Sequence, residues 1–370
     1  MSGRLSRLYH GETTIDFFGR RRAGFVVSGI LLAVFVVSLF VQGLNLGIDF
    51  RGGVAFEVPA TATMDVEAAR RVVETSGVES ASSAKIQTLS SGENQRVRLQ
   101  LGDMPSESQD ELRTALAGAA GVDAEDVSVA AVSSSWGRNI TERAVLALAV
   151  FLVLVSAFIA WRFEWRMAVG AMSAVVHDVL ISVGVYSLFD LEVSPATVVA
   201  FLTILGYSLY DTIVVFDKVD ENVRRFSGSR VSYGDIVNVS MNQVLMRSLN
   251  TSISSVLPVL SLYVLGSMVF GAVALRDFSL ALIVGLSTGA YSSIFIAAPV
   301  LGILRERSSG YVAEKGRLSR GADMAVLMAT GAPASRRAHA RSGTEAAVEP
   351  VAPVEALLNH PPRPRKKTRR

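Results

Sequence analysis

The sequence has no cysteine, and its 370 residues include only four histidines. Without cysteine there is no disulfide bond and no thiolate site, although this absence does not decide the compartment. The sequence also lacks a P-loop, a nucleophile elbow, a dinucleotide-binding fingerprint and any ligand spacing typical of a metal site. We therefore expect no enzyme activity, no cofactor and no metal. Any work that the protein does should draw on an ion gradient or on a partner.

Charged residues are few, at 19% of the chain, whereas half of all residues are hydrophobic. With its positive mean hydropathy, this composition is typical of a polytopic α-helical membrane protein. A membrane-spanning helix needs about 20 mostly apolar residues. Six apolar runs are predicted to be transmembrane helices: residues 23–41, 144–160, 167–189, 195–216, 248–270 and 278–304. The first run is long for a signal peptide and no A-x-A cleavage site follows it, so we expect it to remain uncleaved.

Residues 45–138, between the first and second runs, have mixed charge and alternating polarity, as in a soluble α+β domain. Strict alternation over residues 96–101 predicts a half-buried strand. The expected elements are strands at 54–58, 84–89, 96–101 and 126–132 and helices at 65–75 and 105–116. Their order, β-α-β-β-α-β, matches a ferredoxin-like unit.

The distribution of lysine and arginine predicts the orientation. Basic residues gather in residues 1–22, in the link 217–247 and in the tail 305–370, whereas the link 190–194 has none. By the positive-inside rule, both termini are cytoplasmic and the 45–138 domain lies outside. The remaining five runs form a bundle over residues 144–304. The basic tail, rich in alanine, proline and arginine, is expected to be disordered and solvated, with binding of anionic lipid or RNA less favoured.

Asp211 is an acid inside the fourth apolar run, where a charge costs at least ~2.5–3.5 kcal/mol. Arg247, at the mouth of the fifth run, lies at a comparable depth. If the two helices are neighbours, an Asp211–Arg247 pair would hold the acid ionised, and protonation of Asp211 would change how the helices pack. This is the physical basis of a proton-coupled switch. A static salt bridge, or an arginine that extends to lipid headgroups, is the alternative.

His177 and Asp178 lie near the centre of the third run. Histidine titrates near neutral pH and a desolvated aspartate can do so, which suggests a proton relay. Adjacent helical residues point about 100° apart, so the two cannot face one partner. The alternative is that Asp178 makes a polar contact with a neighbouring helix while His177 faces a cavity.

Small and hydroxyl-bearing residues accompany these charges. Gly206, Tyr207, Ser208 and Tyr210 surround Asp211, and the fifth and sixth runs are rich in serine, threonine, glycine and alanine. Such residues allow close helix packing, in a moving bundle or in a static one.

Several motifs resemble the SecD/SecF family of protein-export subunits, and specifically its SecF branch. The stretch GIDFRGG resembles the segment that opens the family's outer domain; it supplies Gly47, Asp49, Phe50, Arg51, Gly52 and Gly53. Residues 162–182, 202–224 and 242–252 resemble the signatures of the third, fourth and fifth spans. The last two contain Gly206, Tyr207, Asp217, Asn242 and Gln243. The resemblance covers about residues 10–305.

The resemblance implies a subunit of the bacterial inner membrane that works with SecD beside the SecYEG channel. It implies use of the proton gradient to draw the translocating preprotein outward, with SecA as an indirect partner and no nucleic acid. The implied fold is half of a twelve-span assembly of the resistance-nodulation-division type. The family's proton-pathway aspartate and arginine correspond to Asp211 and Arg247.

The sequence departs from the family pattern at three places. Tyr210 stands where asparagine is common, two arginines are missing from residues 217–222, and no Gly-Pro precedes the second span. Two other functions remain open. A small-molecule or lipid exporter of the same superfamily would favour a second outer domain and twelve spans. A scaffold of the translocon that transduces no energy would tolerate Asp211→Asn.

Overall fold

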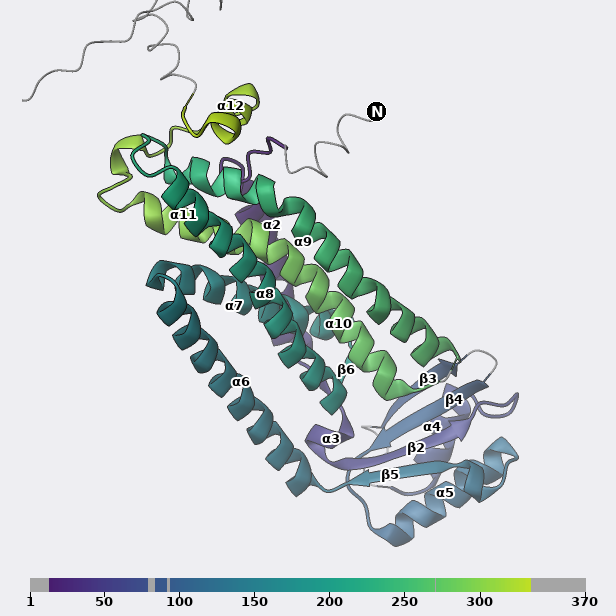
Figure 1. The fold of residues 1–370 in the computed structure, drawn as a ribbon. Coiled ribbons are helices and arrows are strands. Elements are labelled where there is room, and N and C mark those ends of the chain that lie inside the picture. Colours follow the sequence, from purple (N-terminus) through teal and green to yellow (C-terminus); the bar gives the residue numbers. More distant parts are fainter. Residues whose placement is uncertain (1–12, 79–83, 92–93, 270, 334–370) are drawn as a thin grey trace, which may run out of the picture.

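The computed structural model describes residues 13–78, 84–91, 94–269 and 271–333. It consists of a bundle of long helices with a small α+β domain at one end (Figure 1). The long helices of the bundle are α2 (Arg21–Gln42), α6 (Ser134–Arg162), α7 (Trp165–Leu188), α8 (Pro195–Arg225), α9 (Tyr233–Val264) and α10 (Val273–Ser292). A π-helical turn, η4 (Ser293–Ala297), joins α10 to α11 (Ala298–Glu306), and together they form one long helix.

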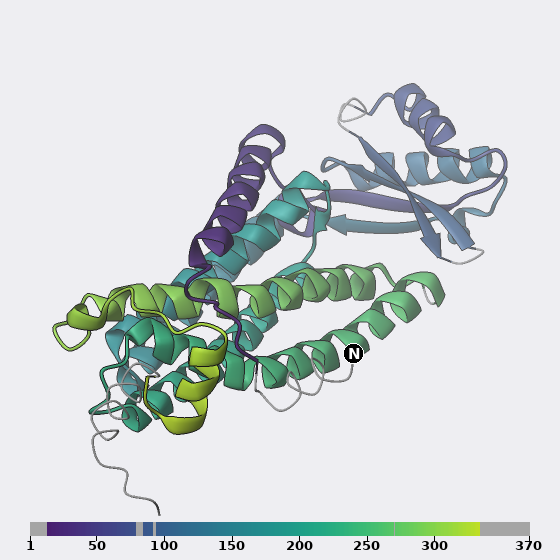
Figure 2. The same ribbon diagram turned by 90° about the horizontal axis from the view of Figure 1, so that it is seen from above.

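Five helices in the described part of the chain are long and apolar enough to cross a membrane: α2, α6, α7, α8 and the continuous segment α10–η4–α11. The chain is therefore a multi-pass helical membrane protein. Helix α9, which contains the predicted fifth span, is not among the five. Its second half carries Asn250, Pro258 and several serines, which lower its hydropathy. It nevertheless packs along α10 and α8 within the bundle (Figure 1 and Figure 2).

The α+β domain has the element order expected from the sequence. Its elements are β2 (Gly53–Pro59), α4 (Val66–Thr75), β3 (Lys85–Ser91), β4 (Asn94–Leu101), α5 (Ser106–Ala120) and β5 (Ser128–Val132). The antiparallel sheet has the order β3-β4-β2-β5. Phe56 is fully buried at its centre, opposite Leu99 of β4 and Val129 of β5. The Asp65 side chain accepts a hydrogen bond from Ala68 N and so fixes the start of α4.

Two pairs of helix bounds extend beyond the predicted apolar runs, and one predicted boundary is wrong. The domain boundary at residue 138 falls inside α6, because Ser133 caps this helix and its first turns extend beyond the apolar run. The link 217–247 is mostly helical, because α8 continues to Arg225 and α9 begins at Tyr233. Helix propensity and tertiary packing extend both helices past the apolar residues that mark a span in the sequence.

A tight joint connects the α+β domain to the bundle. Strand β1 (Asn45–Leu46) pairs in parallel with β6 (Glu192–Val193), and the short helix α3 (Ile48–Arg51) packs against α6. Gly52 and Gly53 follow, with φ of 79° and 132°. A Cβ on Gly52 would lie 2.5 Å from Ser134 Cα, so the GG pair lets the chain turn where it meets α6. The GIDFRGG motif is thus part of this joint.

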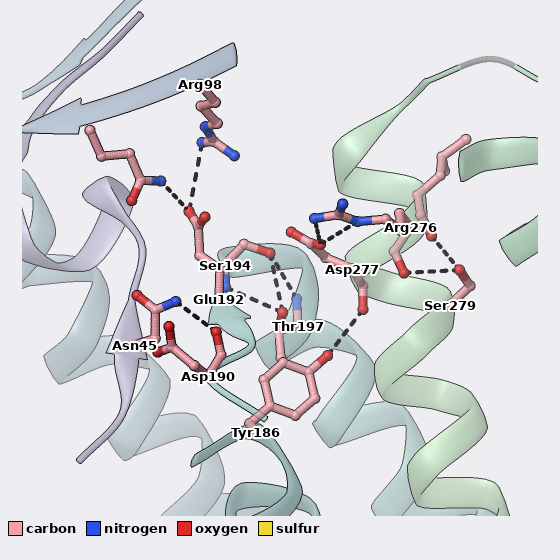
Figure 3. A network of polar contacts seen from close by, with 12 residues as sticks. Asn45, Arg98, Tyr186, Asp190, Glu192, Ser194, Thr197, Arg276, Asp277 and Ser279 are labelled. Atoms are coloured by element: carbon pink, nitrogen blue, oxygen red, sulfur yellow. Dashed lines mark hydrogen bonds and ion pairs between the residues drawn. The ribbon is translucent and has the colours of Figure 1, made fainter. Parts of the chain in front are cut away.

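Polar contacts strengthen the joint (Figure 3). Gln100 Nε2 donates to Glu192 Oε1 at 2.8 Å, and the Arg98 guanidinium lies 3.6 Å from the same oxygen. Asn45 Nδ2 donates to Asp190 O at 3.0 Å, as Figure 3 shows. Glu192 and Asp190 belong to the α7–α8 connection, whereas Arg98 and Gln100 belong to β4. The sheet of the α+β domain is therefore bound directly to the end of the bundle.

The opposite end of the bundle is covered by both ends of the described chain (Figure 1). Asp16 pairs with Arg320 at 2.9 Å, and Asp235, at the start of α9, accepts hydrogen bonds from Ser319. Met324 and Leu327 of α12 (Ala322–Thr330) are fully buried. The prediction of a disordered tail is therefore wrong for residues 305–333, where apolar side chains pack on the bundle. Residues 334–370 and 1–12 lie outside the described residues.

Candidate functional site

Two carboxylates are buried at the centre of the bundle. Asp178 of α7 has 1% of its surface exposed and Asp211 of α8 has 8%. Glycines on α10 allow the helices to come this close. A Cβ on Gly289 would lie 3.0 Å from Ser208 Cβ, and one on Gly285 would overlap the Ile204 side chain.

Asp211 is bound by two serine hydroxyls from two other helices. Ser248 of α9 donates to Asp211 Oδ2 at 2.5 Å, and Ser293 of η4 donates to the same oxygen at 2.7 Å. Both serines are buried. Hydrogen bonds from hydroxyls to an ionised carboxylate are short and strong, and they stabilise its charged form.

Asp178 has a matching environment. Ser208 of α8 donates to Asp178 Oδ2 at 2.6 Å and Ser292 of α10 donates to it at 2.7 Å. The other carboxylate oxygen lies 3.1 Å from Nδ1 of the neighbouring His177. The two predicted residues of the third span therefore contact each other, and Asp178 makes the predicted polar contacts with neighbouring helices.

His177 faces another side of α7, as expected from its position next to Asp178. Its ring is buried and stacks on Tyr291 of α10, with 6.0 Å between the ring centroids. The Tyr291 hydroxyl donates to Gly24 O of α2 at 3.0 Å. His177 Nε2 has no hydrogen-bond partner among the residues that the structure describes. A buried ring nitrogen of this kind is a candidate for binding water or a proton.

A small cavity lies beside Asp211. Its volume is about 20 Å³, which is room for about one water molecule, and its walls include Tyr207, Tyr210, Thr251 and Ser252. Tyr207 and Tyr210 are about half exposed on the outside of α8. A water-sized space between the surface of the bundle and a carboxylate is suited to proton access.

The predicted ion pair between Asp211 and Arg247 is not formed. Among the described residues no ion pair joins them, and the Arg247 side chain is exposed on α9. The reason is the phase of the helix. Adjacent residues point about 100° apart, so Arg247 turns away when its neighbour Ser248 faces Asp211.

The other residues of the spanning motifs lie elsewhere. Asn242 binds the main chain of Ile15 through both its amide atoms, at 2.9 and 2.8 Å. Gln243 Oε1 accepts a hydrogen bond from Asn222 at 2.9 Å. Asp217 is exposed in the part of α8 that follows the apolar run, 3.9 Å from Arg162, and Gly206 faces open space. Gly206 and Tyr207 thus lie on the outer side of α8, and Asp217, Asn242 and Gln243 lie at the end of the bundle away from the α+β domain.

The sequence reasoning missed the serines as ligands of the two acids. In the sequence, Ser208 stands out only as a small residue near Asp211. The serines of the last two spans stand out only because these spans are rich in small residues. The neighbouring pair Ser292–Ser293 was a usable signal. One of these serines binds Asp178 and the other binds Asp211.

The comparisons with known proteins agree with the motifs. Residues 112–307, more than half of the chain, match the family described as "Protein export membrane protein SecD/SecF, C-terminal". Residues 37–64 match the "SecD/SecF GG Motif", which includes the glycine joint.

Similar curated proteins carry one name. The "Protein translocase subunit SecF" of Streptomyces coelicolor is 40% identical over 85% of this chain and 83% of its own length. Its namesake from Mycobacterium tuberculosis is 41% identical over 82% of this chain and 70% of its own length. Both relatives are therefore matched over most of their length.

A solved structure is also similar. The crystal structure of SecDF from Thermus thermophilus, described as "a translocon-associated membrane protein", has a TM-score of 0.72 and 34% identity over 80% of this chain. The present chain spans only 39% of that SecDF chain. The matched family, the full-length relatives and the shared fold agree, and this chain belongs to the SecD/SecF family of protein-export membrane proteins.

Proposed function

We propose that the chain is a proton-driven accessory subunit of the Sec protein translocase, the SecF partner of a SecD subunit. It acts beside SecYEG and promotes export of the translocating preprotein, with SecA as an indirect partner. The relatives named as SecF translocase subunits support this proposal, and so does the translocon-associated SecDF structure.

The observation that carries proton coupling is the pair of buried, serine-bound acids. An ionised carboxylate at membrane depth is costly, and the hydroxyls of Ser248 and Ser293 offset part of this cost at Asp211. Protonation of the bound oxygen removes these two acceptor interactions. Asp211 is therefore the loading site, reached through the cavity beside Tyr207 and Tyr210. Asp178 and His177 form the second part of the relay.

Arg247 acts on Asp211 through its charge. It directly precedes Ser248 on α9, so a rotation of this helix by about 100° exchanges the serine for the arginine at the carboxylate. The ion pair expected from the sequence then belongs to another step of the transport cycle.

The proposed architecture has six spans, with the second half of α9 as the fifth. The β2-to-β5 unit is an extracytoplasmic ferredoxin-like domain, and both termini lie in the cytoplasm of a bacterial cell. Exposed apolar side chains on α6 and α9, such as Leu154 and Leu257, meet SecD or membrane lipid. The chain itself is not an enzyme and binds no nucleic acid.

The test is Asp211→Asn, which removes the titrating group with almost no change in volume. We expect membrane insertion to remain and the stimulation of export by the proton gradient to be lost. Asp217→Asn is the matched control, because Asp217 is an exposed acid of the same helix. Normal gradient-driven secretion by the Asp211 variant would reject the proton role and favour a scaffold that transduces no energy.

A further inference from the structure

The two carboxylates share one structural element, the start of the π-helical turn after α10. Ser292 is the last residue of α10 and Ser293 is the first of η4. Their hydroxyls bind different acids, Asp178 and Asp211. Because the serines are consecutive, their Cα atoms are joined by a single peptide unit, and one cannot rotate far without moving the other.

Each of these hydroxyls has a second acceptor within reach. Ser292 Oγ lies 3.3 Å from Gly289 O, and Ser293 Oγ lies 3.2 Å from Ala290 O. The carboxylate bonds are shorter, at 2.7 Å each. A hydroxyl can therefore leave a protonated carboxylate and bind the carbonyl of its own helix instead, which gives two discrete arrangements. π-helical turns are uncommon and occur frequently at functional sites.

We propose that Ser292 and Ser293 couple the protonation of Asp178 to that of Asp211 through this turn. The inference rests on the proposed proton-driven function and names the residues that link its two acids. Protonation of Asp211 releases Ser293 toward Ala290 O, the turn rearranges, and Ser292 changes its bond to Asp178. The two acids then load and release protons as a unit instead of independently.

The other titratable or charged groups around the pair have fixed places. His177 lies beside Asp178, and Tyr291 of α10 stacks on His177. Tyr207 and Tyr210 of α8 line the cavity at Asp211, and Arg247 precedes Ser248 on α9. Helix α8 provides a second connection between the two acids, because Ser208 binds Asp178 and lies one helical turn before Asp211. The test must separate the serine turn from this route and from interaction through space.

The experiment measures the protonation midpoint of Asp211 by infrared difference spectroscopy of the full-length chain in lipid nanodiscs. The carboxyl band is assigned by its loss in Asp211→Asn. We expect Asp178→Asn to shift this midpoint by about one pH unit, the size that marks coupled sites. In a Ser292→Ala background the same shift should fall to less than half. Ser287→Ala is the matched control, because this exposed serine of α10 bonds only to Ile283 O.

An equal shift with and without Ser292 would overturn the proposal, and so would no shift in the wild-type chain. If Asp178→Asn does not fold, the reciprocal measurement replaces it: the Asp178 midpoint with and without Asp211→Asn, since coupling is reciprocal. If Ser292→Ala leaves the shift of the Asp211 midpoint unchanged while export still requires Asp211, only the coupling between the two acids is rejected. Absence of any Asp211 titration between about pH 4 and pH 9 would reject the proposed function as well.

Discussion

At the scale of single residues, Asp211 shows how a small polar group can replace a charged partner. Its two hydroxyl donors come from α9 and from η4. Each supplies a hydrogen bond without bringing a second charge into the membrane, where a charge is costly. The carboxylate is therefore bound without a counter-charge in contact with it, whereas a close guanidinium would form an ion pair.

Arg247 gives a prediction at this scale. Its guanidinium is exposed and forms no ion pair with Asp211 among the described residues, and in the proposed cycle it acts on the acid through its positive charge. Arg247→Lys keeps the charge and should retain most of the gradient-driven export, whereas Arg247→Met should lose about tenfold or more, a barrier change of about 1.4 kcal/mol. Export rates measured in membrane vesicles check this order. A lysine variant as inactive as the methionine variant would show that the planar fork of arginine is needed, and thus a direct ion pair during transport.

At the scale of elements, two short segments control how the parts of the chain join. The GG pair allows α3 and β2 to pack against α6. The segment that follows α11 binds the start of α9, where Ser319 N donates to Asp235. In each case a helix end forms the contact, because its free main-chain and capping groups bind other segments.

The glycine joint gives the first prediction for an element. Gly52 and Gly43 both have positive φ, 79° and 72°, but only Gly52 touches a neighbour. Gly43→Ala should cost only the backbone strain, about 1–3 kcal/mol. Gly52→Ala should cost clearly more, because the main chain of Ser134 must also move. Thermal unfolding in detergent compares the two variants. Equal losses would mean that the approach to α6 is not what requires glycine at Gly52.

Asp235 gives the second prediction for an element. It lies outside the candidate membrane spans, and burial raises its pKa to about 6, although Ser319 donates to its carboxylate. Because the pKa of Asp235 is higher in the folded chain than its ordinary value of 3.8, protonated Asp235 stabilises the fold. This stabilisation is complete below pH 3.8 and is lost as the pH rises through about 6. The difference between 3.8 and about 6 corresponds to about 3 kcal/mol in the free energy of unfolding.

Asp235→Asn keeps an acceptor oxygen for Ser319 and cannot titrate. The variant should therefore unfold at a higher temperature than the wild type at pH 7.5, and the difference should vanish near pH 4. The exposed Asp323 of α12 supplies the control variant, Asp323→Asn, for which no such pH-dependent difference is expected. A difference independent of pH would contradict the assignment of this titration to Asp235.

At the scale of the whole molecule, the bundle separates two polar ends. The α+β domain lies at one end and the paired Asp16–Arg320 region at the other (Figure 1 and Figure 2). The acids lie between them, and α7 and α8 connect the acids to the contacts of Glu192 with the α+β domain. A change in helix packing at Asp211 would therefore reach the α+β domain through these two helices.

The proposed topology can be tested because the chain has no native cysteine. Single cysteines at Glu125, exposed in the α+β domain, and at Ser227, exposed after α8, report the two ends. In intact cells a membrane-impermeant maleimide should label Glu125→Cys, whereas Ser227→Cys should react only after lysis. The reverse pattern would invert the orientation, and labelling of both in intact cells would exclude the proposed topology.

The sequence by itself determined the membrane class, the order of the domain's strands and helices, and the presence of two acids, Asp178 and Asp211, inside apolar runs. These features depend on local chemistry: apolar length, the alternation of residues 96–101, and the cost of an acid in an apolar run. Only the tertiary structure decided the partners of the acids. Whether Ser248 or Arg247 faces Asp211 depends on the rotation of α9 against α8 and α10, which close packing sets and no local pattern encodes. The same holds for Ser292 and Ser293, whose hydroxyls bind two different acids because α7 and α8 both pack against α10 and η4 at this point.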